Sequence, residues 1–191
     1  YEHINYVGKH SSIPHTEGMR ERTRIEHGVS KAYAITGSRI GIIAATEWIE
    51  KGCNKLQGQS TSGPCSVSQK AAEAAYTTSQ ECVETMRKAF ERRRDLIVEL
   101  AKDIPGLEVN KPEGAFYLFP KCSSFFGKSY NGKKIENSTD LAMFLLEVGH
   151  VATVGGDAFG DPYCFRMSYA TSDDNIREAM KRIKDTLALL A

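Results

Sequence analysis

The segment from Gly28 to Ala45 constrains this chain more than any other. It consists mainly of apolar and small residues and carries only two charged side chains, Lys31 and Arg39. A small and flexible lead-in precedes Lys31, and Arg39 follows eight residues later. Residues 39–45 then form a run that is apolar on both faces of an extended chain, which predicts a buried strand. A lysine without charged neighbours in such surroundings is desolvated, which favours its neutral, nucleophilic amine.

The lysine and the arginine together fit one kind of chemistry. A neutral amine attacks a carbonyl carbon, and an arginine is a permanent cation whose planar donors suit a phosphate. A carbonyl-reactive lysine with a phosphate anchor is what a pyridoxal phosphate site requires. The spacing alone leaves a structural alternative open, in which Lys31 is a surface residue and Arg39 pairs with a carboxylate.

The composition argues against several other classes of protein. The 191 residues carry a formal net charge of +1 with acidic and basic residues interspersed, which disfavours a nucleic-acid-binding surface. No apolar run is long enough to cross a membrane and no signal-peptide pattern is present, so we expect a cytoplasmic protein without a membrane partner. The chain starts at Tyr1 rather than at a methionine, and we expect it to be a piece of a longer protein.

The cysteines and histidines give no sign of a metal site. Five cysteines are scattered along the chain without a CxxC pair, so we expect buried, reduced thiols rather than disulfides or a zinc site. The histidines show no metal-ligand spacing either, and we expect no metal. The histidines are His3, His10, His15, His27 and His150.

Alternation, helical periodicity and turn residues predict a mixture of strands and helices. The predicted strands are 1–7, 22–27, 39–45, 107–109, 115–119, 151–154 and 164–170. The predicted helices are 47–56, 67–104 with a break near 77–79, 138–149 with Ser138 as its N-cap, and a last helix capped by Ser172. Residues 57–66 are rich in glycine, serine and threonine and form the candidate domain boundary, and residues 121–137 are expected to form a polar loop.

Arg166 is the one charged residue of the apolar strand predicted at 164–170. A guanidinium inside such a strand needs an anionic partner, because burying it unpaired costs several kcal/mol. An internal carboxylate, with Asp157 or Glu113 as candidates, and an anionic ligand are both open. For Phe116, in the aromatic strand at 115–119, packing in the core is favoured over contact with a ligand.

Several of these segments resemble class I aminotransferases, most closely the aspartate aminotransferase group. Ser30-Lys31 followed by Thr36-Gly37-Ser38-Arg39-Ile40-Gly41 is similar to the cofactor-lysine segment of that family, with Ser38 where the family usually has tryptophan. Three further segments resemble family patterns in the family order, and the likeness extends over essentially the whole chain. They are Tyr1-Glu2-His3, Pro112-Glu113-Gly114-Ala115-Phe116-Tyr117 and Phe165-Arg166-Met167-Ser168-Tyr169-Ala170.

The resemblance implies an α/β architecture, the C-terminal part of a pyridoxal-phosphate-dependent transferase fold. Residues 1–66 would be the remnant of the large cofactor-binding domain with its sheet. Residues 67–191 would be the small C-terminal α+β domain, including the long interdomain helix.

The resemblance also implies a role for each candidate site residue. Lys31 would bind pyridoxal 5′-phosphate covalently and move the proton in catalysis. Arg39 would hold the cofactor's phosphate, and Tyr1 would hydrogen-bond its phenolic oxygen. Arg166 would grip the substrate's α-carboxylate, and Phe116 would lie near the substrate.

The activity implied by the resemblance is transamination between an amino acid, with aspartate in first place, and a 2-oxo acid, carried out by a homodimer. Two alternatives stay open. One is another enzyme of the same fold, such as a lyase or a cyclopropane-forming synthase, and the other is a non-catalytic structural or dimerising fragment. We expect these 191 residues alone to be inactive, because the family places further cofactor ligands outside the matching segments.

Overall fold

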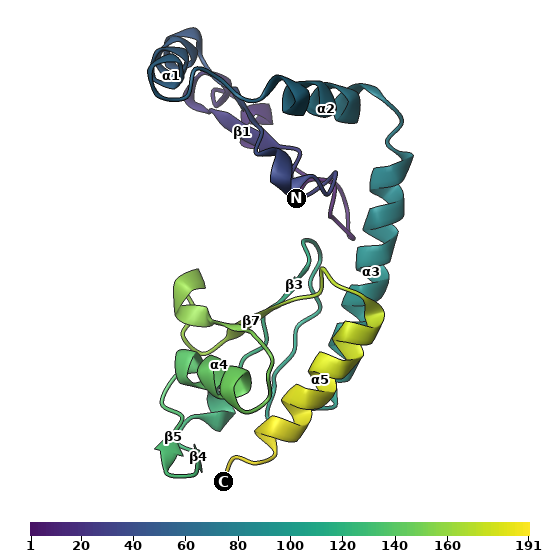
Figure 1. The fold of residues 1–191 in the computed structure, drawn as a ribbon, viewed down its shortest axis with the longest axis vertical. Helices are drawn as coiled ribbons and strands as arrows, with labels where there is room; N and C mark the ends of the chain where they lie inside the picture. Colours follow the sequence, from purple (N-terminus) through teal and green to yellow (C-terminus); the bar gives the residue numbers. More distant parts are fainter. The chain divides into compact units, whose positions relative to one another are not determined.

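The computed structural model describes all of residues 1–191, which form two compact units, residues 1–87 and residues 88–191. Figure 1 shows the course of the chain through both. The first unit holds a short hairpin with helices around it, and the second holds a small antiparallel sheet with helices around it.

The first unit is mostly helical outside its hairpin. Its strands are β1 (Ile25–Gly28) and β2 (Gly41–Ala44). Its α-helices are α1 (Glu47–Ser60), α2 (Ser66–Thr77) and the first turns of α3 (Glu81–Lys102). Short 3₁₀ helices lie at Ile13–His15, Arg20–Arg22 and Thr36–Ser38. The break between α2 and α3 falls at residues 78–80, next to the predicted one.

Strands β1 and β2 pair antiparallel, with Gly28 opposite Gly41 and Ile25 opposite Ala44. The two-stranded sheet confirms the strands predicted at 22–27 and 39–45. The predicted burial of 39–45 is wrong, because Ile42 keeps 46% of its surface exposed and the sheet has no third strand to cover it.

The second unit is built on a three-stranded antiparallel sheet in the order β3-β7-β6. Its strands are β3 (Tyr117–Leu118), β6 (Val154–Gly155) and β7 (Phe165–Ser168), and a separate hairpin pairs β4 (Ser129–Tyr130) with β5 (Lys133–Lys134). Its α-helices are the rest of α3, α4 (Ser138–Glu147) and α5 (Asp173–Leu187). Short 3₁₀ helices lie at Ser123–Phe125 and Gly156–Phe159. The fully buried side chains include Leu118, Leu141, Leu145, Phe165 and Tyr169. The core of this unit therefore lies between its sheet and its helices.

Side-chain hydrogen bonds cap the starts of α4 and α5. Ser172 caps α5 as predicted, since its Oγ accepts a hydrogen bond from the Asn175 N–H at 3.2 Å. The predicted cap of α4 is wrong by one residue. Asn137 is the N-cap, with its Oδ1 accepting from the Asp140 N–H at 2.9 Å, whereas the buried Ser138 Oγ accepts from the Gly156 N–H at 3.0 Å.

Other predicted strands are shorter than expected or absent. Residues 1–7 do not form a strand, because the Ile4 N–H bonds back to the Tyr1 carbonyl at 3.0 Å and makes a turn. Residues 107–109 contribute only a single bridge from Glu108 to Lys121. The loop predicted at 121–137 contains the β4–β5 hairpin, whose turn places Asn131 and Gly132 at positive φ (48° and 80°).

The division of the chain into the two compact units falls after Arg87, within α3, rather than after Ser66. Tyr76 of α2 bonds to His27, and Gln80, directly before α3, accepts a hydrogen bond from Tyr33; these contacts tie α2 and the start of α3 to the first unit. The boundary predicted at 66/67 concerns the domains of the family and stays a prediction.

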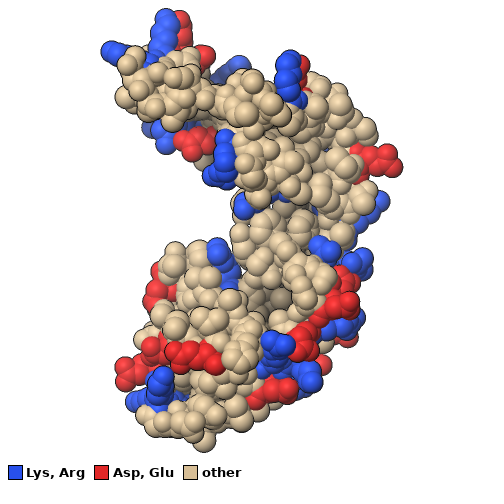
Figure 2. Space-filling view, viewed as in Figure 1, with Lys and Arg blue, Asp and Glu red and all other residues tan.

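No helix of the structure combines the length and the apolar character that crossing a bilayer requires. On the face shown in Figure 2, basic and acidic side chains are interspersed within each unit.

Candidate active site

Lys31 lies in the turn that follows β1. The Tyr33 N–H bonds to the Val29 carbonyl at 3.2 Å, and the Ala34 N–H bonds to the Lys31 carbonyl at 3.3 Å. Val29 and Ala32 are buried, with 1% and 6% of their surfaces exposed, so they anchor the turn. The Lys31 side chain between them is exposed. The predicted desolvation of this amine is therefore not provided by these residues.

Arg39 lies near the other end of the connection between β1 and β2 that begins with the Lys31 turn. It has a left-handed backbone (φ 48°, ψ 53°) and comes directly after the 3₁₀ helix Thr36–Ser38. Its Nη1 donates a hydrogen bond to the Thr36 carbonyl at 3.1 Å, and the side chain is exposed. The carboxylate partner allowed by the structural alternative is not present. Because Gly28 pairs with Gly41, Lys31 and Arg39 belong to one connection whose two ends are held together.

Tyr1 is held near β1 through its neighbour. Glu2 Oε1 lies 3.5 Å from Nε2 of His27, a residue of β1. The Tyr1 side chain itself is 55% exposed. The first unit thus brings Tyr1 to the strand that leads directly into the Lys31 turn.

A cluster of imidazole and phenol rings surrounds Glu2. His27 Nδ1 lies 2.6 Å from the Tyr76 hydroxyl, and the Tyr33 hydroxyl donates to Gln80 Oε1 at 2.8 Å. Burial is the main cause that raises the pKa of both tyrosine hydroxyls, so both stay protonated near neutral pH. This cluster was not predicted, because its members lie far apart in the sequence.

In the second unit, Arg166 lies on the central strand β7, opposite Val154 of β6. Its guanidinium carbon lies 4.4 Å from the centroid of the Tyr117 ring and 4.1 Å from that of Phe159. Neither of the predicted internal partners, Asp157 and Glu113, forms an ion pair with it. Contacts with two aromatic faces hold the guanidinium while leaving its N–H donors available for an anion.

Phe116 is buried, with 7% of its surface exposed. Its ring stacks on Phe90 of α3 at a centroid distance of 5.5 Å and lies 4.6 Å from the ring of Tyr117. The packing role favoured by the sequence is thus observed, and a contact with substrate stays a prediction.

The cysteines form no disulfide. Burial raises the pKa of Cys122 to about 12 and that of Cys164 to about 11, so both remain neutral thiols. The other cysteines, Cys53, Cys65 and Cys82, are exposed, which differs from the expectation that the thiols are buried.

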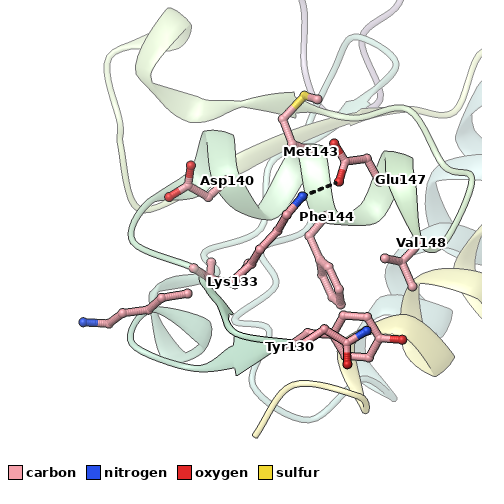
Figure 3. A pocket seen from close by; sticks show the side chains of 10 residues that line it. Tyr130, Lys133, Asp140, Met143, Phe144, Glu147 and Val148 are labelled. Atoms are coloured by element: carbon pink, nitrogen blue, oxygen red, sulfur yellow. Dashed lines mark hydrogen bonds and ion pairs between the residues drawn. The ribbon is translucent and has the colours of Figure 1, made fainter.

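A separate pocket of about 560 Å³ lies between the β4–β5 hairpin and α4. Figure 3 shows the ion pair between Lys133 Nζ and Glu147 Oε2 (3.3 Å) at this pocket, beside Tyr130, Met143 and Phe144. None of the predicted site residues lines it.

The profile of the family described as aminotransferase class I and II matches residues 3–183 of this chain. The chain belongs to this family. A bifunctional aspartate aminotransferase and glutamate/aspartate-prephenate aminotransferase of Petunia hybrida is 45% identical over the whole chain, which covers 41% of that protein. An aspartate aminotransferase of Pinus pinaster is 44% identical, again over the whole chain and over 40% of the relative.

The fold has a solved counterpart in this family. The crystal structure of the aspartate aminotransferase from Rhizobium meliloti is similar with a TM-score of 0.95 and 42% sequence identity, covering all of this chain and 48% of that one. The predicted partial α/β fold is therefore confirmed. The chain spans less than half of the length of each of these relatives.

Proposed function

We propose that the protein carrying this chain catalyses transamination between an amino acid and a 2-oxo acid, with pyridoxal phosphate bound at Lys31. The observation that carries the proposal is the hairpin connection that holds Lys31 and Arg39, in a chain of the aminotransferase family. Aspartate is the expected amino donor, because the names of the relatives include it.

The residues present fit this cofactor. The Lys31 side chain is exposed, so its amine can reach a carbonyl carbon. Arg39 uses Nη1 on the Thr36 carbonyl and keeps further N–H donors for a phosphate. The Tyr1 hydroxyl is a donor suited to a phenolic oxygen. When bound, pyridoxal phosphate supplies an electron-withdrawing ring that stabilises negative charge at the substrate's Cα.

The protein's own residues would then divide the work. Arg166 binds the α-carboxylate of the amino acid with the fork of its guanidinium, which fixes the orientation of the Cα–H bond. The Lys31 amine, when it is not bonded to the cofactor, would remove the Cα proton as a general base and deliver a proton to the cofactor's C4′ carbon as a general acid. Tyr1 and Arg39 hold the ring and the phosphate in place during this transfer.

We further propose that the active protein is a homodimer and that the boundary between its large and small domains falls near residue 66. The family relationship supports both statements.

The proposal is tested with Lys31→Arg in the full-length protein, which keeps the positive charge and removes the primary amine. The rate of oxo-acid formation from aspartate and 2-oxoglutarate should fall by at least about a thousandfold. Lys55→Arg, at an exposed position of α1, is the matched control and should leave the rate unchanged. A Lys31→Arg protein with the parent rate would overturn the proposal.

Product analysis separates the remaining alternatives. Formation of oxaloacetate with consumption of the acceptor supports transamination, whereas ammonia release or a cyclic product indicates a lyase or a synthase. Prephenate belongs among the acceptors tested, because the Petunia hybrida relative is named for it as well.

A further inference from the structure

Three potential metal ligands converge in the first unit, although the sequence separates His27 from Glu2 and His3 by more than twenty residues. The Nε2 atom of His3 lies 3.2 Å from Glu2 Oε1, and the Nε2 atom of His27 lies 3.5 Å from the same oxygen. One ligand atom from each of these residues lies within 4.8 Å of the other two. The turn at the start of the chain supplies Glu2 and His3, and β1 supplies His27.

These separations match those of a tetrahedral zinc site. Zinc bonds of about 2.0–2.1 Å to nitrogen and oxygen place neighbouring donor atoms about 3.3 Å apart. The two distances to Glu2 Oε1, 3.2 and 3.5 Å, lie on either side of that value. Two sides of the ligand triangle thus have the length that zinc requires, and all three ligand atoms lie within 4.8 Å of one another.

The ring of His27 is oriented by a second contact. Its Nδ1 lies 2.6 Å from the Tyr76 hydroxyl, at the opposite side of the ring from the Nε2 atom that faces Glu2. A histidine that ligates a metal through one nitrogen commonly donates its other N–H to an oxygen, which fixes the tautomer and the ring plane. Tyr76 therefore acts as a positioning residue for His27.

The cluster is open enough for a metal ion and water to reach it. The side chains of Glu2, His3 and His27 are 40%, 30% and 29% exposed. Glu2 and His3 line a pocket of about 490 Å³ that also borders the first turns of α3. Two imidazoles and one carboxylate with a free fourth position form the donor set that zinc accepts at open sites.

We propose that Glu2, His3 and His27 bind Zn²⁺ together, with water as the fourth ligand. Sequence spacing does not reveal this site, because His27 reaches the other two ligands only through the path of the chain into β1. The site does not depend on the proposed transamination, and it involves neither Lys31 nor Arg39.

The test is a calorimetric titration of the full-length protein with zinc chloride near neutral pH. The His27→Asn variant loses the Nε2 ligand but keeps a side-chain amide near the position of Nδ1, and His3→Asn removes the second imidazole. Each substitution should raise the dissociation constant for one zinc equivalent by more than about tenfold. His15→Asn, an exposed histidine of the first 3₁₀ helix, is the matched control and should bind zinc like the parent.

Two further variants make the result decisive. Glu2→Gln leaves both rings in place and should weaken zinc binding, and Tyr76→Phe should weaken it by about tenfold through loss of the bond to Nδ1. Unchanged melting temperatures without metal confirm that the variants are folded. Zinc affinity that is the same in the parent, His3→Asn and His27→Asn would overturn the proposal, as would a parent that takes up no zinc.

Discussion

At the scale of single residues, Arg166 shows how a charged side chain is kept in a sheet without an internal acid. Its guanidinium lies against the rings of Tyr117 and Phe159 at 4.4 and 4.1 Å. The sequence indicates that this arginine needs a partner, but it does not separate an acid from an aromatic pair, because the rings reach Arg166 from β3 and from a 3₁₀ helix.

The Arg166→Lys substitution in the full-length protein tests this arrangement. A lysine keeps the charge but lacks the planar fork and the surface that stacks on rings. We expect kcat/KM for aspartate to fall by about tenfold to a hundredfold. Arg182→Lys, on the exposed side of α5, serves as the control. Equal steady-state kinetics for both variants would argue against a role for Arg166 in binding the carboxylate.

Gly156 is required because the backbone around it leaves no space for a side chain. A Cβ atom at this position would collide with the carbonyl oxygens of Asp161 and Cys164. Gly156→Ala should therefore lower the free energy of unfolding by about 3 kcal/mol, measured by urea denaturation. Gly127→Ala, where the Cβ meets no atom but φ is +91°, should cost only about 1 kcal/mol. A Gly156→Ala protein as stable as the Gly127→Ala protein would show that the loop adjusts freely.

At the scale of elements, the start of α5 is tied to α3. Asp173, in the first turn of α5, bonds to Arg92 through Nη2 at 2.9 Å and to Arg93 through Nε at 3.3 Å. The hydrogen bond from Arg92 is the main cause that holds the pKa of Asp173 below its ordinary value. The charged carboxylate is thus favoured in the folded state.

This lowered pKa predicts a pH dependence of stability. The contribution of Asp173 is fully present above the pKa of the unfolded chain, about 3.9, and is lost as the pH falls through the lower pKa of the folded state. Asp173→Asn should therefore be less stable than the parent at pH 7 and approach it in acid. Asp174→Asn shares the helix terminus and is the control. If the loss of unfolding free energy in Asp173→Asn stayed constant from pH 7 into acid, this assignment would be contradicted.

Other features at this scale divide between those that the sequence predicts and those that it does not. The helical period gives α2 and α3, and with the Ser172 cap it gives α5, because these signals depend on neighbouring residues. Helix α1 is predicted only to residue 56, but it continues to Ser60 into the segment predicted as a linker. The cap of α4 is displaced to Asn137 because Ser138 is used to hold the distant Gly156. Long-range bonds of this kind leave no mark in the local sequence.

At the scale of the whole molecule, the sequence predicts which residues are apolar but not what covers them. Ile42 is 46% exposed although its run of apolar residues predicts a buried strand, and Trp48 and Leu56 of α1 are 76% and 74% exposed. The chain spans less than half of the length of these relatives. The burial of a side chain depends on which segments pack against it, and the local sequence does not carry this information. The same holds for Lys31, whose apolar sequence neighbours do not shield its side chain.

The candidate site shows a similar division. The placement of Lys31 and Arg39 on one connection follows from a short stretch of sequence and from the hairpin that this stretch forms. The cluster of Glu2, His3 and His27 needs the turn at residues 1–4 and the path of the chain into β1, and only the structure provides these.

The central claim is that Lys31 carries the cofactor. The most direct measurement is borohydride reduction of the full-length protein with pyridoxal phosphate, followed by proteolysis and mass spectrometry of the peptides. We expect a phosphopyridoxyl group on Lys31 and on no other lysine, and its loss from that peptide in Lys31→Arg. A catalytically active protein labelled at another lysine, or not labelled at all, would contradict the account.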